Sequence, residues 1–175
     1  MCGKLFRTRI REWTVLKSFN HFGVYGVCQR DGKLLVIHKA RGPYTGRYDL
    51  PGGRLEENES LLDGLVREFM EETGFAVKAE RNLGIFDFFV RYQEDDFTHM
   101  HHLAALYQVE LDGEQAPAAI SAFAEQDSNG MEWVELARIT LDSASPAAVL
   151  AAKWLSGDEL TMRTEYYDFW EIKTL

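Results

Sequence analysis

The chain has 175 residues, of which 46% are hydrophobic and 27% are charged, and its formal net charge at pH 7 is -9. This length and composition predict one ordinary globular domain with enough residues for a hydrophobic core. The acidic balance argues against a general nucleic-acid-binding surface, although a metal ion can still reverse the field around a small phosphate substrate.

The cysteine usage and the start of the chain both favour a reducing compartment. Only Cys2 and Cys28 are present, and nothing in their positions requires a disulfide. The basic stretch at the start of the chain is not followed by the apolar segment of a secretory signal, and no apolar run is long enough to cross a bilayer. We therefore expect a cytoplasmic protein without a membrane partner.

The first part of the chain predicts strands followed by a loop. A loose alternation of apolar and polar residues over 6–16 indicates a strand. Residues 21–30 and 33–40 are separated by an Asp-Gly pair, which favours the tight turn of a β-hairpin. Residues 40–53 are rich in Gly and Pro and predict a loop.

A helix is predicted from about Ser60 to Thr73. The Ser60 hydroxyl can cap the first turn, with Asp63 three residues later as a variant of the capping box. Gly74 follows as a residue that readily adopts the left-handed conformation in which helices end. The sequence therefore predicts both ends of this helix.

The second half of the chain predicts more strands and one further helix. Strands are expected at 75–80, 83–92, 101–111 and 131–136, a loop at 113–130 and a helix at 145–155. Pro146 would occupy the first position of that helix, where its missing N–H costs nothing. The tail at 161–173 is compatible with one more strand, whose register the sequence does not define. Strands interleaved with two helices predict a mixed sheet with helices on its faces.

Three glutamates crowd into two turns of the first predicted helix. At about 100° per residue, Glu68, Glu71 and Glu72 share an arc of about 100° beside a wide apolar stripe. Like charges at this spacing repel one another, so they lie either in solvent or around a cation. Gathered carboxylate oxygens suit a hard cation such as Mg²⁺ or Mn²⁺.

The surrounding residues match a known signature. Residues 53–75 fit the pattern G-x5-E-x7-R-E-U-x-E-E-x-G-U, where U is a bulky apolar residue, at every defined position. The matching residues are Gly53, Glu59, Arg67, Glu68, Phe69, Glu71, Glu72, Gly74 and Phe75. This pattern is the Nudix box, and the chain resembles the Nudix hydrolases over most of residues 21–155. The resemblance implies an α/β fold, an α/β/α sandwich with a mixed central sheet, in a single domain of residues 1–175 with both ends packed on the core.

The resemblance also implies roles for the box residues. The three glutamates would bind Mg²⁺ or Mn²⁺ together with the carbonyl group of Gly53. Glu71 or Glu72 would accept the proton of the attacking water, although the base varies within the family. Glu59 would pair with Arg67 and brace the loop against the helix, which would orient the metal ligands.

Candidate substrate contacts lie mostly before the box. Between positions 39 and 54 four cations face a single acid, Asp49, and cations can grip phosphate oxygens. These cations are Lys39, Arg41, Arg47 and Arg54. For each of them, a phosphate contact and an ordinary solvated charge on a loop are equally compatible with the sequence. Tyr92 lies 17 residues beyond the box, about where dinucleoside-polyphosphate members carry a tyrosine, and a core position is its alternative role.

Two other groups of side chains admit more than one interpretation. His99, His101 and His102 suggest zinc, but a strand would place the last two on opposite faces, so we expect a surface cluster. The aromatic tail would either cap the core or form a homodimer interface, and we favour the core. Its aromatic residues are Tyr166, Tyr167, Phe169 and Trp170.

Three functions compete. The leading one is a metal-dependent pyrophosphohydrolase that acts on a small nucleotide-derived substrate, a nucleoside diphosphate linked to another moiety, by attack of water on phosphorus. The second is a non-catalytic domain that senses a nucleotide, but such domains typically lose box carboxylates and this chain retains them. The third is an isopentenyl-diphosphate isomerase, which needs a cysteine in the pocket that Cys28 does not obviously supply.

Overall fold

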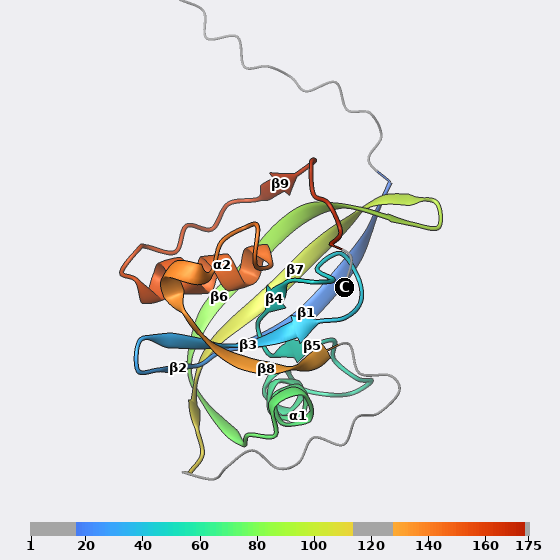
Figure 1. Ribbon diagram of the computed structural model, residues 1–175. Coiled ribbons are helices and arrows are strands. Elements are labelled where there is room, and N and C mark those ends of the chain that lie inside the picture. Colours follow the sequence, from blue (N-terminus) through green and yellow to red (C-terminus); the bar gives the residue numbers. More distant parts are fainter. Residues whose placement is uncertain (1–16, 114–127, 174–175) are drawn as a thin grey trace, which may run out of the picture.

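The structure is a computed structural model that describes residues 17–113 and 128–173. One sheet has the strand order β5-β1-β7-β6-β9, and in the second sheet β3 lies between β2 and β4 and also pairs with β8 (Figure 1). The strands are β1 (Ser18–Val27), β2 (Gln29–Arg30), β3 (Lys33–Lys39), β4 (Tyr48–Asp49), β5 (Gly52–Gly53), β6 (Val77–Glu94), β7 (Phe97–Leu111), β8 (Ser128–Glu135) and β9 (Glu165–Tyr167). The helices are α1 (Leu61–Thr73), α2 (Pro146–Leu155) and the short 3₁₀ helix η1 (Leu136–Arg138).

The two α-helices pack on opposite faces of the five-stranded sheet, as Figure 1 shows. Alternate side chains of β1 point to opposite faces, as the pleat of a strand requires. Val24 belongs to the core cluster that contains Leu65 and Phe69 of α1, whereas Tyr25 belongs to the cluster that contains Ala148 of α2. The predicted α/β architecture, a mixed sheet flanked by helices, is confirmed.

The first predicted hairpin differs from the structure. Strand β1 does not pair with β3, as the hairpin would require. It pairs with β7 in parallel and with β5 in antiparallel orientation. Only the two residues of β2 pair with β3 through the predicted Asp-Gly turn, in which Asp31 and Gly32 both have positive φ. The chain therefore passes from one sheet to the other near Cys28, a change that local alternation does not reveal.

Both ends of α1 agree with the sequence. The Ser60 hydroxyl accepts a hydrogen bond from the Asp63 N–H at 3.2 Å, which satisfies one of the free donors of the first turn. Gly74 ends the helix with φ of 71°, and its N–H donates to the carbonyl of Met70 at 2.8 Å. The second helix begins in the same manner, since the hydroxyl of Ser145 caps it and Pro146 follows.

The remaining strands are longer than predicted. The two strands expected at 75–80 and 83–92 form one continuous strand, β6, because bulges absorb the irregular residues between them. Strand β7 already begins at Phe97. The register of the tail is also defined, since β9 pairs in parallel with β6. The strand expected at 6–16 and most of the loop expected at 113–130 lie outside the described residues.

The prediction that the three histidines form a surface cluster is wrong. His102 is 1% exposed, and its ring nitrogens lie 2.8 Å from the hydroxyl oxygen of Tyr44 and 2.9 Å from that of Tyr25. His99 is also buried. His101 is half-buried and stacks on the ring of Phe89, its neighbour on β6. Two tyrosine hydroxyls satisfy both nitrogens of His102, so its burial in a central strand is possible. Burial lowers the pKa of His102 well below its usual value, so the ring is neutral.

Replacement of His102 by Leu is expected to lower the free energy of unfolding by about 2 kcal/mol, because it removes a partner of two buried hydroxyls. The Tyr44 hydroxyl would lose its bond to the ring, and Tyr25 would keep only its 3.4 Å contact with His21. Urea unfolding followed by circular dichroism measures the effect. His101→Leu is the control and should cost less than about 1 kcal/mol. Equal losses in the two variants would contradict the prediction.

Candidate functional site

Strand β5 brings the backbone against the carboxylate side of α1. The Gly52 N–H donates to the Glu72 carboxylate at 2.8 Å. A Cβ atom at Gly52, where φ is 141°, would lie 2.1 Å from the carbonyl oxygen of Val24, and one at Gly53 would lie 2.8 Å from the Glu68 carboxyl group. Only glycine allows this close approach. The backbone at Gly52 and Gly53 is therefore part of the same site as the two carboxylates.

The carboxylates of Glu68 and Glu72 are partly removed from water. Glu72 is 7% exposed, and burial raises its pKa to about 8, although nearby Lys39 and the Gly52 N–H act in the opposite direction. Burial also raises the pKa of Glu68, opposed by its hydrogen bond from Arg67. Desolvated carboxylates at close quarters favour either a proton or a cation.

Arg67 joins the loop before α1 to the helix. Its guanidinium forms two hydrogen bonds with Glu59, at 2.8 and 2.9 Å, and others with Glu68 at 2.9 Å and Glu71 at 3.2 Å. It also donates to the carbonyl of Arg54 at 3.1 Å. The fork of Arg67 holds the pKa of Glu59 down at about 2. The structure thus places Glu59 and Arg67 in the pairing that the resemblance implied.

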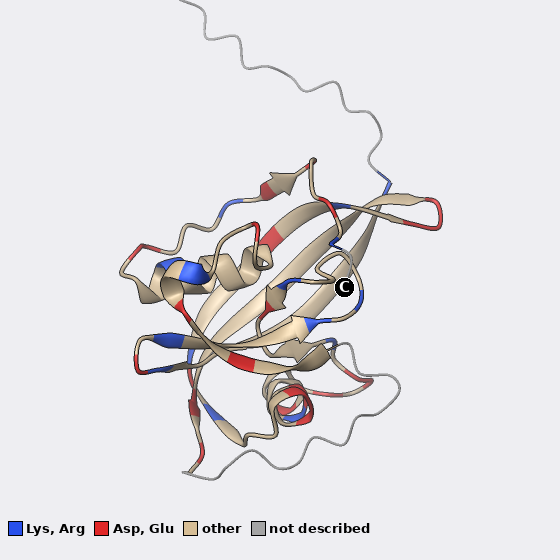
Figure 2. Ribbon diagram, viewed as in Figure 1, with Lys and Arg blue, Asp and Glu red and all other residues tan. Residues whose placement is uncertain are grey.

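The four cations that were predicted to contact phosphate differ in their surroundings; Figure 2 marks Lys and Arg in blue. Lys39, at the end of β3, is near enough to lower the pKa of both Glu68 and Glu72. Arg54 follows β5 directly and is exposed, and Arg41 is exposed on the loop after β3. The guanidinium of Arg47 lies instead against the C-terminal tail.

Tyr92 is half-buried and packs against the core rather than standing free in solvent. Its ring lies edge-on to that of Phe19, with 6.4 Å between the ring centroids. The structure thus places Tyr92 in the packed environment that was its alternative role. A substrate contact of Tyr92 remains a prediction.

Asp49 is a functional candidate that sequence reasoning named only as the single acid of its loop. It is 2% exposed, accepts hydrogen bonds from the Ser145 hydroxyl at 2.5 Å and the Leu50 N–H at 2.9 Å, and burial raises its pKa. Lys39 opposes that rise, and Asp49 in turn acts on Glu72. Its hydrogen-bond donor Ser145 lies 96 residues away, so the sequence does not reveal this pairing. The one local indication of a role for Asp49 was its place before Leu-Pro-Gly-Gly.

The donor groups at the site fit a hard divalent cation. Glu68 and Glu72 face the glycines of β5, whereas the Glu71 side chain is 56% exposed and contacts Arg67. Over residues 17–113 and 128–173, no three His, Cys, Asp or Glu side chains already stand together as a metal-binding group. Carboxylate and carbonyl oxygens are nevertheless the donors that Mg²⁺ and Mn²⁺ prefer, and the two desolvated carboxylates lie beside the Gly53 backbone.

Cys28 does not lie in this site. It is 2% exposed within the core cluster around α1, and burial raises its pKa to about 11. The thiolate is the reactive form of cysteine, so the side chain is inert near neutral pH. This placement gives no support to a catalytic cysteine.

In a Cys2→Ser background, Cys28 is expected to react with a thiol reagent at pH 8 at least about 100-fold more slowly than an exposed cysteine, because the reactive thiolate is scarce and buried. The absorbance of the released reagent group reports the rate. The same protein in 8 M urea (roughly the concentration that unfolds most domains) provides the control for full reactivity. Rapid labelling of the folded protein would show that the thiol is accessible.

No helix within the described ranges 17–113 and 128–173 combines the length and the apolar character needed to cross a membrane.

Comparison with known proteins identifies the family. The model of the NUDIX domain matches residues 17–156. An ADP-ribose pyrophosphatase from Methanocaldococcus jannaschii is 33% identical over 89 residues, which cover 48% of this chain and 53% of that protein. A putative 8-oxo-dGTP diphosphatase from Bacillus subtilis is 33% identical over 115 residues, 66% of each chain. The chain thus spans about half to two thirds of the length of these curated relatives.

Solved structures agree with this assignment at the level of the fold. The MutT NUDIX hydrolase from Burkholderia pseudomallei has a TM-score of 0.60 at 24% identity, over 77% of this chain and 97% of that chain. A MutT protein from Bacillus halodurans has a TM-score of 0.59 at 23% identity, over 88% of this chain and 95% of that chain. With the family model matching most of its length and the complete box folded at one site, the chain belongs to the Nudix hydrolase family.

Proposed function

We propose that this protein is a pyrophosphohydrolase that cleaves a nucleoside diphosphate linked to another moiety. Water attacks a phosphorus of the diphosphate, and the products are a nucleoside monophosphate and the phosphorylated moiety. The observation that carries the proposal is the placement of Glu68 and Glu72, both desolvated, against the Gly52–Gly53 backbone. The names of two relatives, a pyrophosphatase and a diphosphatase, support the same reaction class.

Glu68, Glu71, Glu72 and the Gly53 carbonyl would hold the divalent cation, Mg²⁺ or Mn²⁺. A bound cation of this kind supplies charge neutralisation at the phosphates and a lowered pKa for water. Of the two candidate bases, Glu71 has its side chain in solvent and Glu72 does not. We therefore assign acceptance of the water's proton to Glu71, while Glu72 orients the site through Gly52.

The surrounding residues bind and orient the substrate. Lys39 lies near Glu68 and Glu72, where its ammonium group can contact the phosphates once they are bound. Arg54 follows Gly53 and is exposed at the edge of the site. Arg67 and Glu59 keep the carboxylate of Glu68 in position. These contacts convert a bimolecular attack into one between prealigned groups.

The other functions have less support. A nucleotide sensor does not require the full carboxylate set, which this chain retains. An isomerase of isopentenyl diphosphate would need an accessible cysteine, and Cys28 is buried. A homodimer stays a prediction. In the tail Trp170 packs against the core, whereas Phe169 is 94% exposed.

The test is formation of the nucleoside monophosphate, separated by chromatography, from a panel of substrates with Mg²⁺ or Mn²⁺. The panel contains normal and oxidised nucleoside triphosphates, ADP-ribose, nucleotide sugars, dinucleoside polyphosphates and capped RNA ends. The Glu72→Gln variant, purified in parallel, reports any contaminating phosphatase. Turnover of one substrate well ahead of the rest is expected. Binding of a nucleotide without turnover across the panel would overturn the proposal in favour of a sensor.

A further inference from the structure

The C-terminal tail returns across the domain to the loop between β3 and β4. Figure 1 shows the tail turning back after β9, and a Cβ atom at Gly46 of the loop would lie 2.8 Å from the Cβ of Lys173. Trp170 donates its indole N–H to the carbonyl of Pro43 at 2.7 Å and lies edge-on to the ring of Tyr44, with 5.7 Å between the centroids. The Arg47 guanidinium lies 4.2 Å from the centre of the indole ring. Trp170 therefore contacts the loop at three residues.

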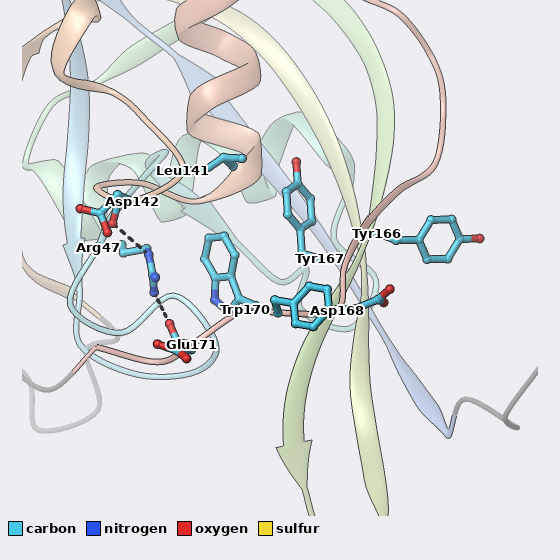
Figure 3. A pocket seen from close by; sticks show the side chains of 9 residues that line it. Arg47, Leu141, Asp142, Tyr166, Tyr167, Asp168, Trp170 and Glu171 are labelled. Atoms are coloured by element: carbon cyan, nitrogen blue, oxygen red, sulfur yellow. Dashed lines mark hydrogen bonds between the residues drawn. The ribbon is translucent and has the colours of Figure 1, made fainter. Parts of the chain in front are cut away.

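The Arg47 side chain also binds the tail (Figure 3). It is 7% exposed, and it donates to the carbonyls of Glu171 at 2.6 Å and Asp142 at 3.2 Å. Lys173 adds an ion pair with Asp142 at 3.1 Å. A pocket of about 410 Å³ lies beside these residues. In this arrangement Arg47 holds the tail, which is an alternative to the phosphate contact predicted for it.

The loop leads from Trp170 to the box carboxylates by way of Lys39. The Lys39 N–H donates to the Arg47 carbonyl at 2.9 Å, and the Gly46 N–H donates to the Lys39 carbonyl at 2.9 Å. These two bonds close the base of the loop. The Lys39 side chain acts electrostatically on Glu72. Any shift of the loop at Arg47 therefore changes the backbone from which the Lys39 ammonium group extends.

A second connection runs through Tyr44 to the floor of the site. The Tyr44 hydroxyl lies 2.8 Å from His102, whose other ring nitrogen lies 2.9 Å from the Tyr25 hydroxyl. The Tyr25 ring packs beside Gly52, where a Cβ would lie 3.0 Å from it. The loop that Trp170 contacts is thus joined to Tyr25 by buried hydrogen bonds, and the Tyr25 ring packs against the backbone at Gly52.

We propose that Trp170 is a positioning residue of the hydrolase. It holds the loop at 40–47 in one conformation and thereby keeps the Lys39 ammonium group beside the box carboxylates, where the substrate phosphates bind. The proposal rests on the proposed function. Trp170 lies beyond residues 17–156, so the match to the family model assigns it no role. The competing interpretation is that the tail only covers the core.

The experiment compares Trp170→Ala with Phe169→Ala, because Phe169 is its chain neighbour and is 94% exposed. Trp170→Ala is expected to raise KM roughly tenfold with a smaller change in kcat, since misplaced contacts weaken substrate binding. Amide hydrogen exchange of residues 40–47 should accelerate in the same variant. The affinity for Mn²⁺ alone should stay unchanged, because Lys39 is not a metal ligand. Phe169→Ala should match the native protein in all three measurements.

Trp170→Phe provides a variant with a milder effect on folding. It keeps a ring against Arg47 and Tyr44 but loses the N–H donor to Pro43, so an intermediate KM is expected. Equal KM values for native protein, Trp170→Phe and Phe169→Ala would overturn the proposal, even where the loop exchanges faster. Absence of turnover in the native protein is a different result: it removes the proposed function, and this inference with it.

Discussion

Glu72→Gln is expected to lower kcat by roughly 100-fold or more while the protein remains folded. Substitutions that only disturb the partners of metal ligands already cost about 10–100-fold, and this one removes the ligand charge itself. The side chain amide oxygen of Gln can still accept the hydrogen bond from Gly52. Initial rates on the best substrate of the panel, together with Mn²⁺ titration, measure the loss of turnover and of metal affinity.

The stability of the same variant provides its control. Burial raises the pKa of Glu72 from the ordinary 4.5 to about 8, so the metal-free folded state binds this proton more tightly than the unfolded chain. The stabilisation from that proton is complete below pH 4.5 and is lost as pH rises through 8. In EDTA at about pH 9, Glu72→Gln should therefore unfold at a higher temperature than the native protein. A lower Tm would mean that lost activity reflects misfolding.

Glu71→Gln separates proton transfer from metal binding. The Glu71 side chain is 56% exposed and contacts Arg67, whereas Glu72 is buried against β5. Loss of turnover is expected in both variants, with the larger loss of Mn²⁺ affinity in Glu72→Gln. Full activity in both would refute the assignment of the box carboxylates.

Arg67→Lys is expected to lower kcat/KM by about 10–100-fold and the free energy of unfolding by about 1–2 kcal/mol. Lysine keeps the positive charge but cannot reproduce the fork that bridges Glu59 and Glu68. Glu68 would then lose the partner that keeps its carboxylate beside Gly53. Kinetics at saturating Mg²⁺ and urea unfolding at pH 7 give the two quantities.

The pH dependence of unfolding tests the cause of that loss. Arg67 lowers the pKa of Glu59 from the ordinary 4.5 to about 2 in the folded protein. The stability from this pair is present above pH 4.5 and is lost as pH falls toward 2. The difference in stability between native protein and Arg67→Lys should therefore shrink between pH 7 and about pH 3. A difference that is constant across this range would assign the loss to packing alone.

Local chemistry explains what could be predicted. The ends of α1 depend on Ser60, Asp63 and Gly74, which act within three or four residues of their partners. The acidic arc of α1 follows from helical geometry, and the spacing of the box links glycines, glutamates and arginine along 23 residues of one chain segment. The family and its α/β architecture were accessible for the same reason.

The predictions that failed concern contacts between distant segments. His102 is buried because Tyr44, 58 residues away, and Tyr25 satisfy its ring. The phosphate contact of Arg47 stays a prediction, although its guanidinium also donates to the Glu171 carbonyl, 124 residues along the chain. Alternation within β1 is the same whether the strand pairs with β3 or with β7, so its partner was not predictable.

The sequence by itself determined the carboxylate set, the helix that carries it and the family, because these depend on spacing within one segment. Only the tertiary structure decided that Glu72 is buried against Gly52, that Asp49 accepts a hydrogen bond from Ser145 and that Trp170 contacts the loop after Lys39. The physical reason is that burial and pairing are set by which surfaces meet when the chain folds. Residue type and local periodicity do not record which distant segment will supply the partner.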